Sequence, residues 1–258
     1  MKIREFLRVI DSFAPFDLAE DWDNSGLMLG SLESEVKGVA VCLDAVHEAV
    51  IKAAESNCNV LLCHHPLIFR GIRSINLDSE QGMTISEAIK RDVNIIAAHT
   101  NWDKASEGVN FQLAKTLGLN DIMPLDSFGL SGKLTHSMSP NEFLEHVKRV
   151  WNLSRLDYYA ANHENISRVS LCGGSGSEFW RSAKKLGSDV YITADMKYHD
   201  LIDSTRDGLN ILLIEHGEME RVSLPALANK VSDCGIKVIL LDVKALTMPY
   251  RMNIGENL

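Results

Sequence analysis

The stretch Leu61-Leu62-Cys63-His64-His65-Pro66-Leu67-Ile68-Phe69 decides how the fold is interpreted. Residues 60–62 form a short apolar run that is typical of a buried parallel strand, and two adjacent histidines follow where this run ends. Pro66 has no N–H group and biases His65 away from helical dihedral angles, so we expect both histidines on an irregular turn at the carboxyl end of the strand. Neighbouring side chains of an extended segment point to opposite sides, so the pair suits two metal ions better than one. The alternative is a pair of hydrogen-bonded loop histidines without a metal.

Length and composition indicate an ordinary globular protein. The 258 residues can bury a substantial core and suit one large or two small domains. The net charge of -9 argues against nucleic acid as a partner, because binding to its phosphates needs a basic face. The N-terminus has the pattern of an amphipathic helix, and no apolar run reaches membrane-spanning length. We therefore expect a cytoplasmic protein without a membrane partner.

Strands and helices alternate in the first half of the chain. The expected elements are strands at 39–43, 59–63 and 93–98, with helices at 46–56 and 84–91. This succession predicts an α/β fold with a mostly parallel sheet, in which ligands bind beyond the carboxyl ends of the strands. His99 and Asp103 follow the third strand, so they join the two histidines as candidates. The alternative is that Asp103 caps a turn and that His99 is a core histidine.

The second half begins with a change of composition around residues 124–132, which predicts a domain boundary. The expected elements that follow are helices at 140–151, 177–186 and 221–233, and strands at 154–160, 167–172, 190–193, 209–214 and 236–241. Two of these strands lead into an acid and an imidazole four residues apart, namely Asp195 with His199 and His216 with Glu220. This spacing suits one helical face. Helix capping by Asp195, with His199 exposed, is the alternative for the first pair.

Two further stretches have a structural interpretation when they are considered alone. Residues 22–30 have the composition of a loop and hairpin. The glycine-rich residues 172–176 lie between a strand and a helix, where free N–H groups can bind phosphate. They lack both the dinucleotide-binding and the P-loop patterns, so we interpret them as a tight structural turn.

Five side chains at strand ends form a candidate metal site: His64, His65, Asp103, His216 and Glu220. Three imidazoles and two carboxylates without a thiolate suit borderline divalent ions such as Zn, Mn, Fe, Co or Ni, and their number suits two ions per subunit. Two ions about 3.5–4 Å apart polarise a substrate oxygen and lower the pKa of a shared water, as hydrolytic enzymes require. The alternative is that the five residues are unrelated.

Several motifs follow one another along nearly the whole chain: Trp22-Asp23-Asn24-Ser25-Gly26-Leu27, His64-His65-Pro66, His99-Thr100-Asn101-Trp102-Asp103 with Gly108-Val109-Asn110, Thr193-Ala194-Asp195 with Tyr198-His199, and His216-x-x-x-Glu220. In this order they resemble the YbgI family, whose members are named GTP cyclohydrolase I type 2 homologues or NGG-interacting-factor-three-like proteins. The resemblance implies that the five candidate residues hold a dinuclear metal centre in which Glu220 touches both ions. It also implies two related, intertwined α/β domains with mixed, mostly parallel sheets, with the metals in the cleft between the domains, and a homohexamer that forms a toroid. The chain departs from the family pattern at residues 215–220, where the family has a glycine before the histidine and an aromatic residue after it.

The leading hypothesis is a metal-dependent hydrolase, similar to GTP cyclohydrolase I type 2, that acts on a small, nucleotide-like substrate. The competing hypothesis is a non-catalytic metal-binding ring that stores or delivers metal or serves as a scaffold. The catalytic acid and base are not assigned. We expect His99, Asp195 and His199 beside the metal ligands, where such groups orient ligands and substrate.

The positions of the ligands predict that the first domain is discontinuous. His64 and Asp103 come from the first α/β unit, and Glu220 must come within about 2.0–2.2 Å of the same metals. The chain must therefore return to the first unit near residue 208. The predicted first domain comprises 1–125 plus 208–258 and carries the ligands, with a second α/β domain inserted at 126–207. This arrangement places the strands at 209–214 and 236–241 in the first sheet.

Overall fold

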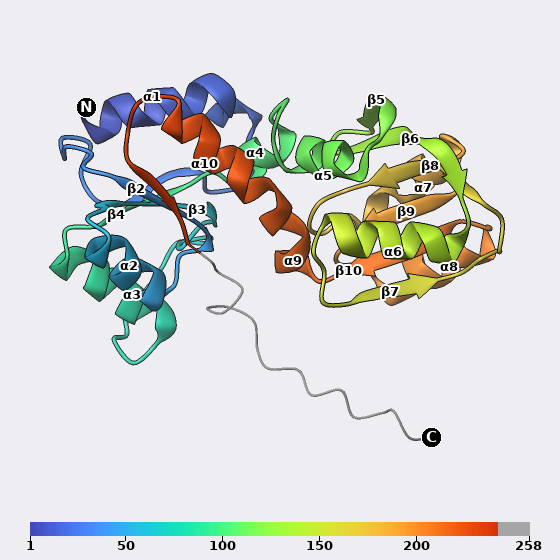
Figure 1. The fold of residues 1–258 in the computed structure, drawn as a ribbon. Coiled ribbons are helices and arrows are strands. Elements are labelled where there is room, and N and C mark those ends of the chain that lie inside the picture. The colour runs from blue at the N-terminus through green and yellow to red at the C-terminus, as the bar shows by residue number, and fades with distance from the viewer. Residues whose placement is uncertain (242–258) are drawn as a thin grey trace.

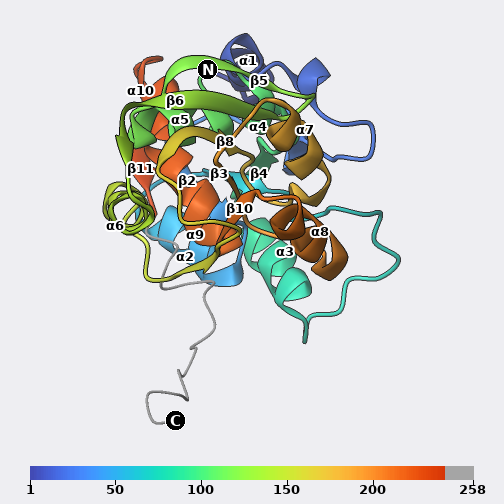
Figure 2. The same ribbon diagram turned by 90° about the vertical axis from the view of Figure 1, so that its right-hand side faces the viewer.

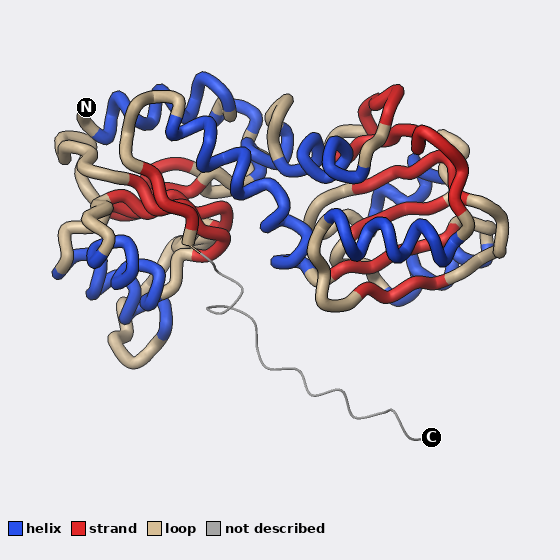
Figure 3. Tube along the Cα trace, in the orientation of Figure 1, coloured by secondary structure: helices blue, strands red, loops and turns tan. Residues whose placement is uncertain are grey.

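Two sheets, each covered by helices, organise the chain (Figure 1). The computed structural model describes residues 1–241, and Figure 3 shows its strands gathered in two separate groups. The chain builds four strands of the first sheet, then the whole second sheet, and returns to the first sheet for its last described strand. The expected α/β fold with two sheets is thus confirmed. Within residues 1–241, no helix is both long enough and apolar enough to span a bilayer.

The first sheet has the strand order β1-β4-β3-β2-β11. Its strands are β1 (Gly26–Leu29), β2 (Val39–Asp44), β3 (Val60–His65), β4 (Asn94–Ala97) and β11 (Val238–Leu240). Over the described residues β1 is antiparallel to β4 and the other neighbours are parallel, so this sheet is mostly parallel as expected. Figure 1 shows its two faces covered by different helix pairs: α2 (His47–Glu55) with α3 (Glu80–Lys90), and α1 (Ile3–Phe13) with α10 (Leu224–Ser232). Burial on both faces explains the continuous apolar runs of its central strands.

The second sheet has the order β5-β6-β8-β9-β10-β7. Its strands are β5 (Asn120–Leu125), β6 (Gly129–Met138), β7 (Leu156–Tyr159), β8 (Ile166–Leu171), β9 (Val190–Thr193) and β10 (Asn210–Ile214). β9 is parallel to both of its neighbours, whereas the other described pairs are antiparallel. The expectation of mostly parallel strands is therefore wrong for this sheet. Figure 1 shows α6 (Pro140–Val150) in front of the sheet, with α7 (Trp180–Lys185) and α8 (Tyr198–Arg206) behind it.

The strand expected at 209–214 lies in the second sheet, so its predicted place in the first sheet is wrong. β10 pairs in parallel with β9 and antiparallel with β7. The chain returns only after Ile214, through α9 (His216–Glu220), a 3-10 turn (Arg221–Ser223) and α10. β11 then pairs in parallel with β2, as expected for the strand at 236–241. A short apolar strand carries no local signal for one sheet over the other, because both sheets offer it apolar neighbours.

The chain passes from one sheet to the other between α5 (Val109–Leu117) and β5. The expected boundary at 124–132 falls inside the antiparallel pair β5–β6, so its turn-forming composition marks a hairpin. Asp126, at the turn of this hairpin, has a positive φ of 56°. The division into domains 1–125 plus 208–258 and 126–207 stays a prediction, and its residues 242–258 lie outside the described residues.

Candidate metal centre

Both histidines of β3 belong to the strand itself, so the expectation of an irregular turn is wrong. His65 pairs with Asp44 of β2 in the parallel ladder, and Pro66 follows the last paired residue. The His64 Nδ1 atom lies 2.9 Å from the carbonyl oxygen of Ala98, and the His65 Nδ1 atom lies 2.7 Å from Asp44 Oδ1. These oxygens favour a proton on each Nδ1, so Nε2 is the atom of each ring that can bind a metal once it carries no proton.

Glu220 lies at the centre of the predicted ligands. Its Oε2 atom is 2.8 Å from His65 Nε2 and 3.7 Å from His64 Nε2. Its Oε1 atom is 3.0 Å from His216 Nε2, and Asp103 Oδ1 lies 3.6 Å from His64 Nε2. Glu220 belongs to two groups of donors, each with its atoms within 4.8 Å of one another: His64 with Asp103 and Glu220, and His65 with His216 and Glu220. A third such group consists of His64, His65 and His99. The structure therefore brings all five predicted side chains together, with Glu220 common to the first two groups.

Two buried atoms of this cluster lack a hydrogen-bond partner among the described residues. They are His64 Nε2 and Asp103 Oδ1, which face each other at 3.6 Å. A buried polar atom without a partner costs about 1–3 kcal/mol, and native proteins rarely leave one without a reason. A nitrogen lone pair and a carboxylate oxygen that share one space are the donors that a borderline divalent cation needs. The cluster thus fits a metal ion.

A one-turn helix holds the last two ligands. α9 places His216 and Glu220 four residues apart on one face, and the Glu215 side chain caps the helix by accepting the Glu218 N–H at 2.7 Å. The His216 Nδ1 atom lies 2.6 Å from Asp195 Oδ2. Asp195 therefore orients the His216 ring in the way that Asp44 orients His65.

The glycine-rich turn after β8 forms a wall of the cluster. Gly174 has a φ of +68°, and a Cβ atom at this position would lie 2.5 Å from Glu220 Oε1 and 3.4 Å from His216 Nε2. Only a residue without a side chain leaves room for both ligands here. The interpretation of residues 172–176 as a tight turn agrees with this backbone, and the turn has the added effect of shaping the metal cluster.

Burial and close contacts shift the pKa values of the cluster in opposite directions. Burial raises the pKa of Asp103 to about 7. Burial also acts on Glu220, but the surrounding imidazoles outweigh it and hold its pKa well below the usual range. For His65, burial opposes protonation, yet the hydrogen bonds to Asp44 and Glu220 raise the pKa to about 10. The same balance, with Glu220 as the main partner, raises the pKa of His216 to about 9. Without metal, the cluster therefore holds protons where cations would bind.

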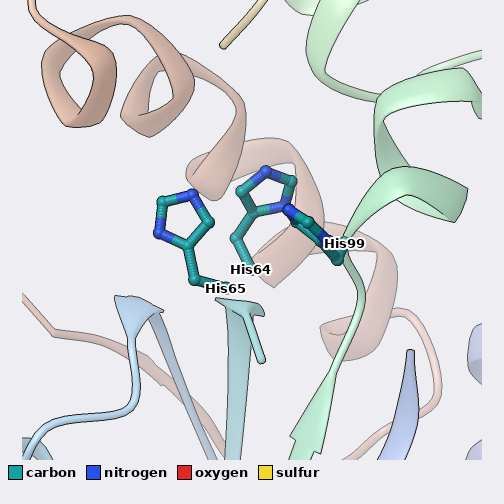
Figure 4. Close-up of side chains that lie close together, drawn as sticks. All are labelled: His64, His65 and His99. Atoms are coloured by element: carbon teal, nitrogen blue, oxygen red, sulfur yellow. The ribbon is translucent and has the colours of Figure 1, made fainter. Parts of the chain in front are cut away.

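His99 lies beside the cluster and is held by Asp23. Its ring centroid is 5.3 Å from that of His64 and 5.7 Å from that of His65 (Figure 4). The His99 Nδ1 atom lies 2.6 Å from Asp23 Oδ1, and Asp23 Oδ2 accepts the Thr100 N–H at 3.1 Å. Burial opposes the charge on Asp23, but His99 and Thr100 together hold the pKa of this carboxyl well below its usual range.

Two of these carboxylates, Asp23 and Asp44, were not predicted from the sequence as part of the site. Asp23 lies in the stretch that we interpreted as a loop and hairpin, and its partner His99 is 76 residues away, so no local pattern reveals it. Asp44 ends a buried strand just as the histidines do, and this position was a signal that could have identified it.

Asp195 and His199, which were also expected beside the metal ligands, lie in different surroundings. Asp195 contacts His216, as described above, but it precedes α8, whereas His199 lies inside that helix. The two residues therefore do not share a helical face, and this part of the expectation is wrong. His199 is exposed, and its ring lies 5.4 Å from that of Tyr198.

A cavity of about 830 Å³ adjoins the cluster and is lined by strand ends of the first sheet and by loops that adjoin both sheets. His65, Asp103, His216 and Glu220 contribute to its wall, so four of the five predicted ligands border it, whereas His64 is fully buried behind them. A concave site with converging polar groups and shifted pKa values is the usual setting of a binding or active site.

The chain is similar to known proteins in sequence and in fold. Residues 1–246 match the sequence profile of the family Duf34/NIF3 (NGG1p interacting factor 3). A protein of Clostridium perfringens named GTP cyclohydrolase 1 type 2 homolog is 36% identical over 241 residues, which cover 90% of this chain and 92% of the relative. The solved structure of the hypothetical protein SA1388 from Staphylococcus aureus has a TM-score of 0.89 at 28% identity, covering 97% of this chain and 99% of that one. Reduced HcgD from Methanocaldococcus jannaschii has a TM-score of 0.81 at 28% identity, covering 94% and 98%.

Proposed function

Because the chain belongs to the Duf34/NIF3 family, we propose that it is a dinuclear metal-dependent hydrolase that acts on a small, nucleotide-like substrate. The main support is the pair of buried, unpartnered atoms His64 Nε2 and Asp103 Oδ1. Such a pair is costly without a cation between the two donors. The adjoining cavity favours a catalytic role over metal storage, since storage needs no space for an organic molecule.

The five clustered side chains would hold two divalent ions, drawn from Zn, Mn, Fe, Co or Ni. His64 and Asp103 would hold one ion and His65 and His216 the other, and Glu220 would contribute to both, as its place in two groups of donors suggests. Bound ions of this kind lower the pKa of a shared water and polarise a substrate oxygen. We extend the proposal to the homohexameric toroid that the family resemblance implies.

The residues around the ligands would orient them and handle protons. The Ala98 carbonyl, Asp44 and Asp195 each engage the Nδ1 atom of one histidine ligand. Asp23 engages Nδ1 of His99 in the same way. Nε2 is then the His99 atom that remains to exchange a proton with a bound substrate or water.

Metal analysis is the first test of this proposal. Protein purified without a chelator should contain up to two equivalents of divalent metal per chain. Replacing His64 and Glu220 together by Ala should remove most of this metal, whereas the exposed His163→Ala control should keep it. Full metal retention in the double variant would contradict the assignment of these ligands.

Turnover is the second test. The metal-loaded and metal-stripped proteins should be assayed with GTP and with a panel of cyclic and phosphorylated nucleotides. Hydrolysis that depends on the metal would support the proposed hydrolase function. A protein with two equivalents of metal that hydrolyses no member of the panel would support the competing hypothesis of a metal store, a metal-delivery protein or a scaffold.

A further inference from the structure

Four aromatic side chains line the cavity beside the candidate metal centre: Trp22, Phe69, Phe128 and Phe179. Trp22 precedes β1 and Phe69 follows β3 of the first sheet, and their ring centroids are 5.8 Å apart. Phe128 and Phe179 come from segments of the second sheet, and their rings stack with centroids 6.3 Å apart at an angle of 10°. One cavity therefore receives an aromatic pair from each sheet.

The pair from the first sheet is exposed although its backbone is anchored. Trp22 is 60% exposed and Phe69 is 41% exposed, which is unusual for rings of this size. The Asn24 side chain donates a hydrogen bond of 2.5 Å to the carbonyl oxygen of Ile68, so the two loops are tied to each other. Phe69 lies near the start of the segment 66–79 between β3 and α3, which projects from the rest of the molecule in Figure 2. Exposed aromatic rings that are held in place at the wall of a cavity are typical of a ligand-binding surface.

The charge of the cavity wall argues against a polyphosphate. Besides the candidate ligands Asp103 and Glu220, four carboxylates line the cavity: Glu20, Asp44, Glu178 and Glu215. No lysine or arginine is among the described residues that line it. Lys104 lies nearby, but its Nζ atom is 2.5 Å from Glu20 Oε1 and 5.4 Å from the centroid of Phe128. A chain of phosphates that extends beyond the metals would meet negative charge there, whereas a neutral or cationic group would not.

Building on the function proposed above, we propose that this cavity binds a planar heteroaromatic ring that is neutral or cationic. The ring would lie between two aromatic pairs, Trp22–Phe69 on one side and Phe128–Phe179 on the other. The aromatic pairs supply stacking surface, and wall carboxylates outside the candidate metal ligands, such as Glu178, accept hydrogen bonds from ring N–H groups. The substrate class is thus that of a nucleoside or a related heterocycle, and a polyphosphate tail is not a recognition element.

Calorimetric titration of the metal-loaded full chain tests this inference. The ring probes are adenosine, guanosine and the cationic thiamine, and the comparison compound is ribose 5-phosphate, which has a phosphate but no ring. At least one ring probe should bind tenfold more tightly than ribose 5-phosphate. Trp22→Leu and Phe128→Leu should each weaken that binding about tenfold, as expected for the loss of one stacking partner. Tyr159→Leu removes an exposed ring of β7 that is not part of the cavity wall, so it should leave binding unchanged.

The inference is overturned if no ring probe binds better than ribose 5-phosphate. It is also overturned if the double variant Trp22→Leu/Phe128→Leu binds rings as tightly as the original chain. Metal content, measured for every variant, separates this inference from the proposed function. A folded protein that binds no metal contradicts the proposed function, whereas a protein with two equivalents of metal that ignores all rings contradicts only the inference drawn here.

Discussion

At the scale of single residues, the candidate ligands have one ring nitrogen engaged and the other directed at a shared carboxylate. His64, His65 and His216 each have Nδ1 within 2.9 Å of an oxygen atom. Their Nε2 atoms lie 2.8 to 3.7 Å from Glu220. Because the oxygen partners set both the tautomer and the ring orientation, the donors are arranged for cations before any cation arrives.

The same contacts predict that metal binding strengthens with rising pH. Without metal, the raised pKa values of His65, about 10, and of His216, about 9, keep both imidazoles protonated at pH 7. A cation must displace these protons, and part of the proton on Asp103, whose pKa is about 7. The apparent affinity should therefore rise from pH 6 to pH 9.

Titrating metal in two buffers of different ionisation enthalpy at pH 7 should show that protons are released. The His64→Ala/Glu220→Ala protein is the control, since it should neither bind metal nor release protons. An affinity that does not change over this pH range would contradict the proposed coupling between protons and metal.

Gly174 offers a matched pair of substitutions. In Gly174→Ala, the new Cβ would lie 2.5 Å from Glu220 Oε1, whereas in Gly187→Ala it would meet nothing within 4 Å. Both glycines have a positive φ, +68° and +72°, so both variants should lose about 1–2 kcal/mol of stability from backbone strain. Only Gly174→Ala should also lose metal, measured as bound equivalents. Equal metal content in the two variants would show that Gly174 does not shape the site.

At the scale of elements, two helices, each of five residues, together carry three of the five candidate ligands. α4 (Thr100–Lys104) carries Asp103, and α9 carries His216 and Glu220. A helix of one turn is unstable by itself, so tertiary contacts must hold it. For α4, one such contact is Asp23, which accepts the N–H of its first residue.

Disrupting the contact between Asp23 and His99 should lower stability and activity but leave metal binding unchanged. Asp23→Asn removes a buried charge that His99 and Thr100 stabilise, so the protein should lose about 1–3 kcal/mol of unfolding free energy. The depressed pKa of Asp23 stabilises the fold above the pKa of the unfolded state. This contribution disappears in acid, so the difference between the two proteins should shrink below about pH 4.

Metal content should stay near that of the original chain in both Asp23→Asn and His99→Ala, while any hydrolytic activity falls. His163→Ala serves again as the control, because that residue is exposed. Loss of both metals from His99→Ala would mean that His99 is itself a ligand, as its place in one group of possible donors with His64 and His65 allows.

At the scale of the whole molecule, the site exists because the chain leaves the first sheet and comes back. The last ligands follow β10 of the second sheet, and α10 and β11 then rejoin the first sheet. A chain truncated after Ile214 keeps every described strand of the second sheet but lacks His216 and Glu220. It should bind no metal, and the first sheet should unfold more easily because β2 loses the neighbour β11.

Metal analysis and thermal unfolding of the truncated protein would check this prediction, with the full chain in parallel. If the fragment 1–214 bound two equivalents of metal, the return of the chain would not be needed for the site.

The sequence by itself determined the elements with strong local periodicity and the identity of the candidate ligands. The buried strands that end at Asp44, His65 and Ala97 were predicted within a few residues, because continuous apolar runs and flanking helices are local signals. The five clustered side chains were predicted because His, Asp and Glu at strand ends are chemically distinctive in an α/β sheet.

Only the tertiary structure decided which sheet β10 joins, that Asp23 holds His99, and that Gly174 leaves room for Glu220. It also decided which aromatic rings share the cavity. Each of these outcomes depends on atoms that are distant in sequence, and neither hydrophobic periodicity nor residue type specifies such a partner. Side chains converge where the backbone carries them, so the geometry of the site follows from packing, while its chemistry is already present in the residues.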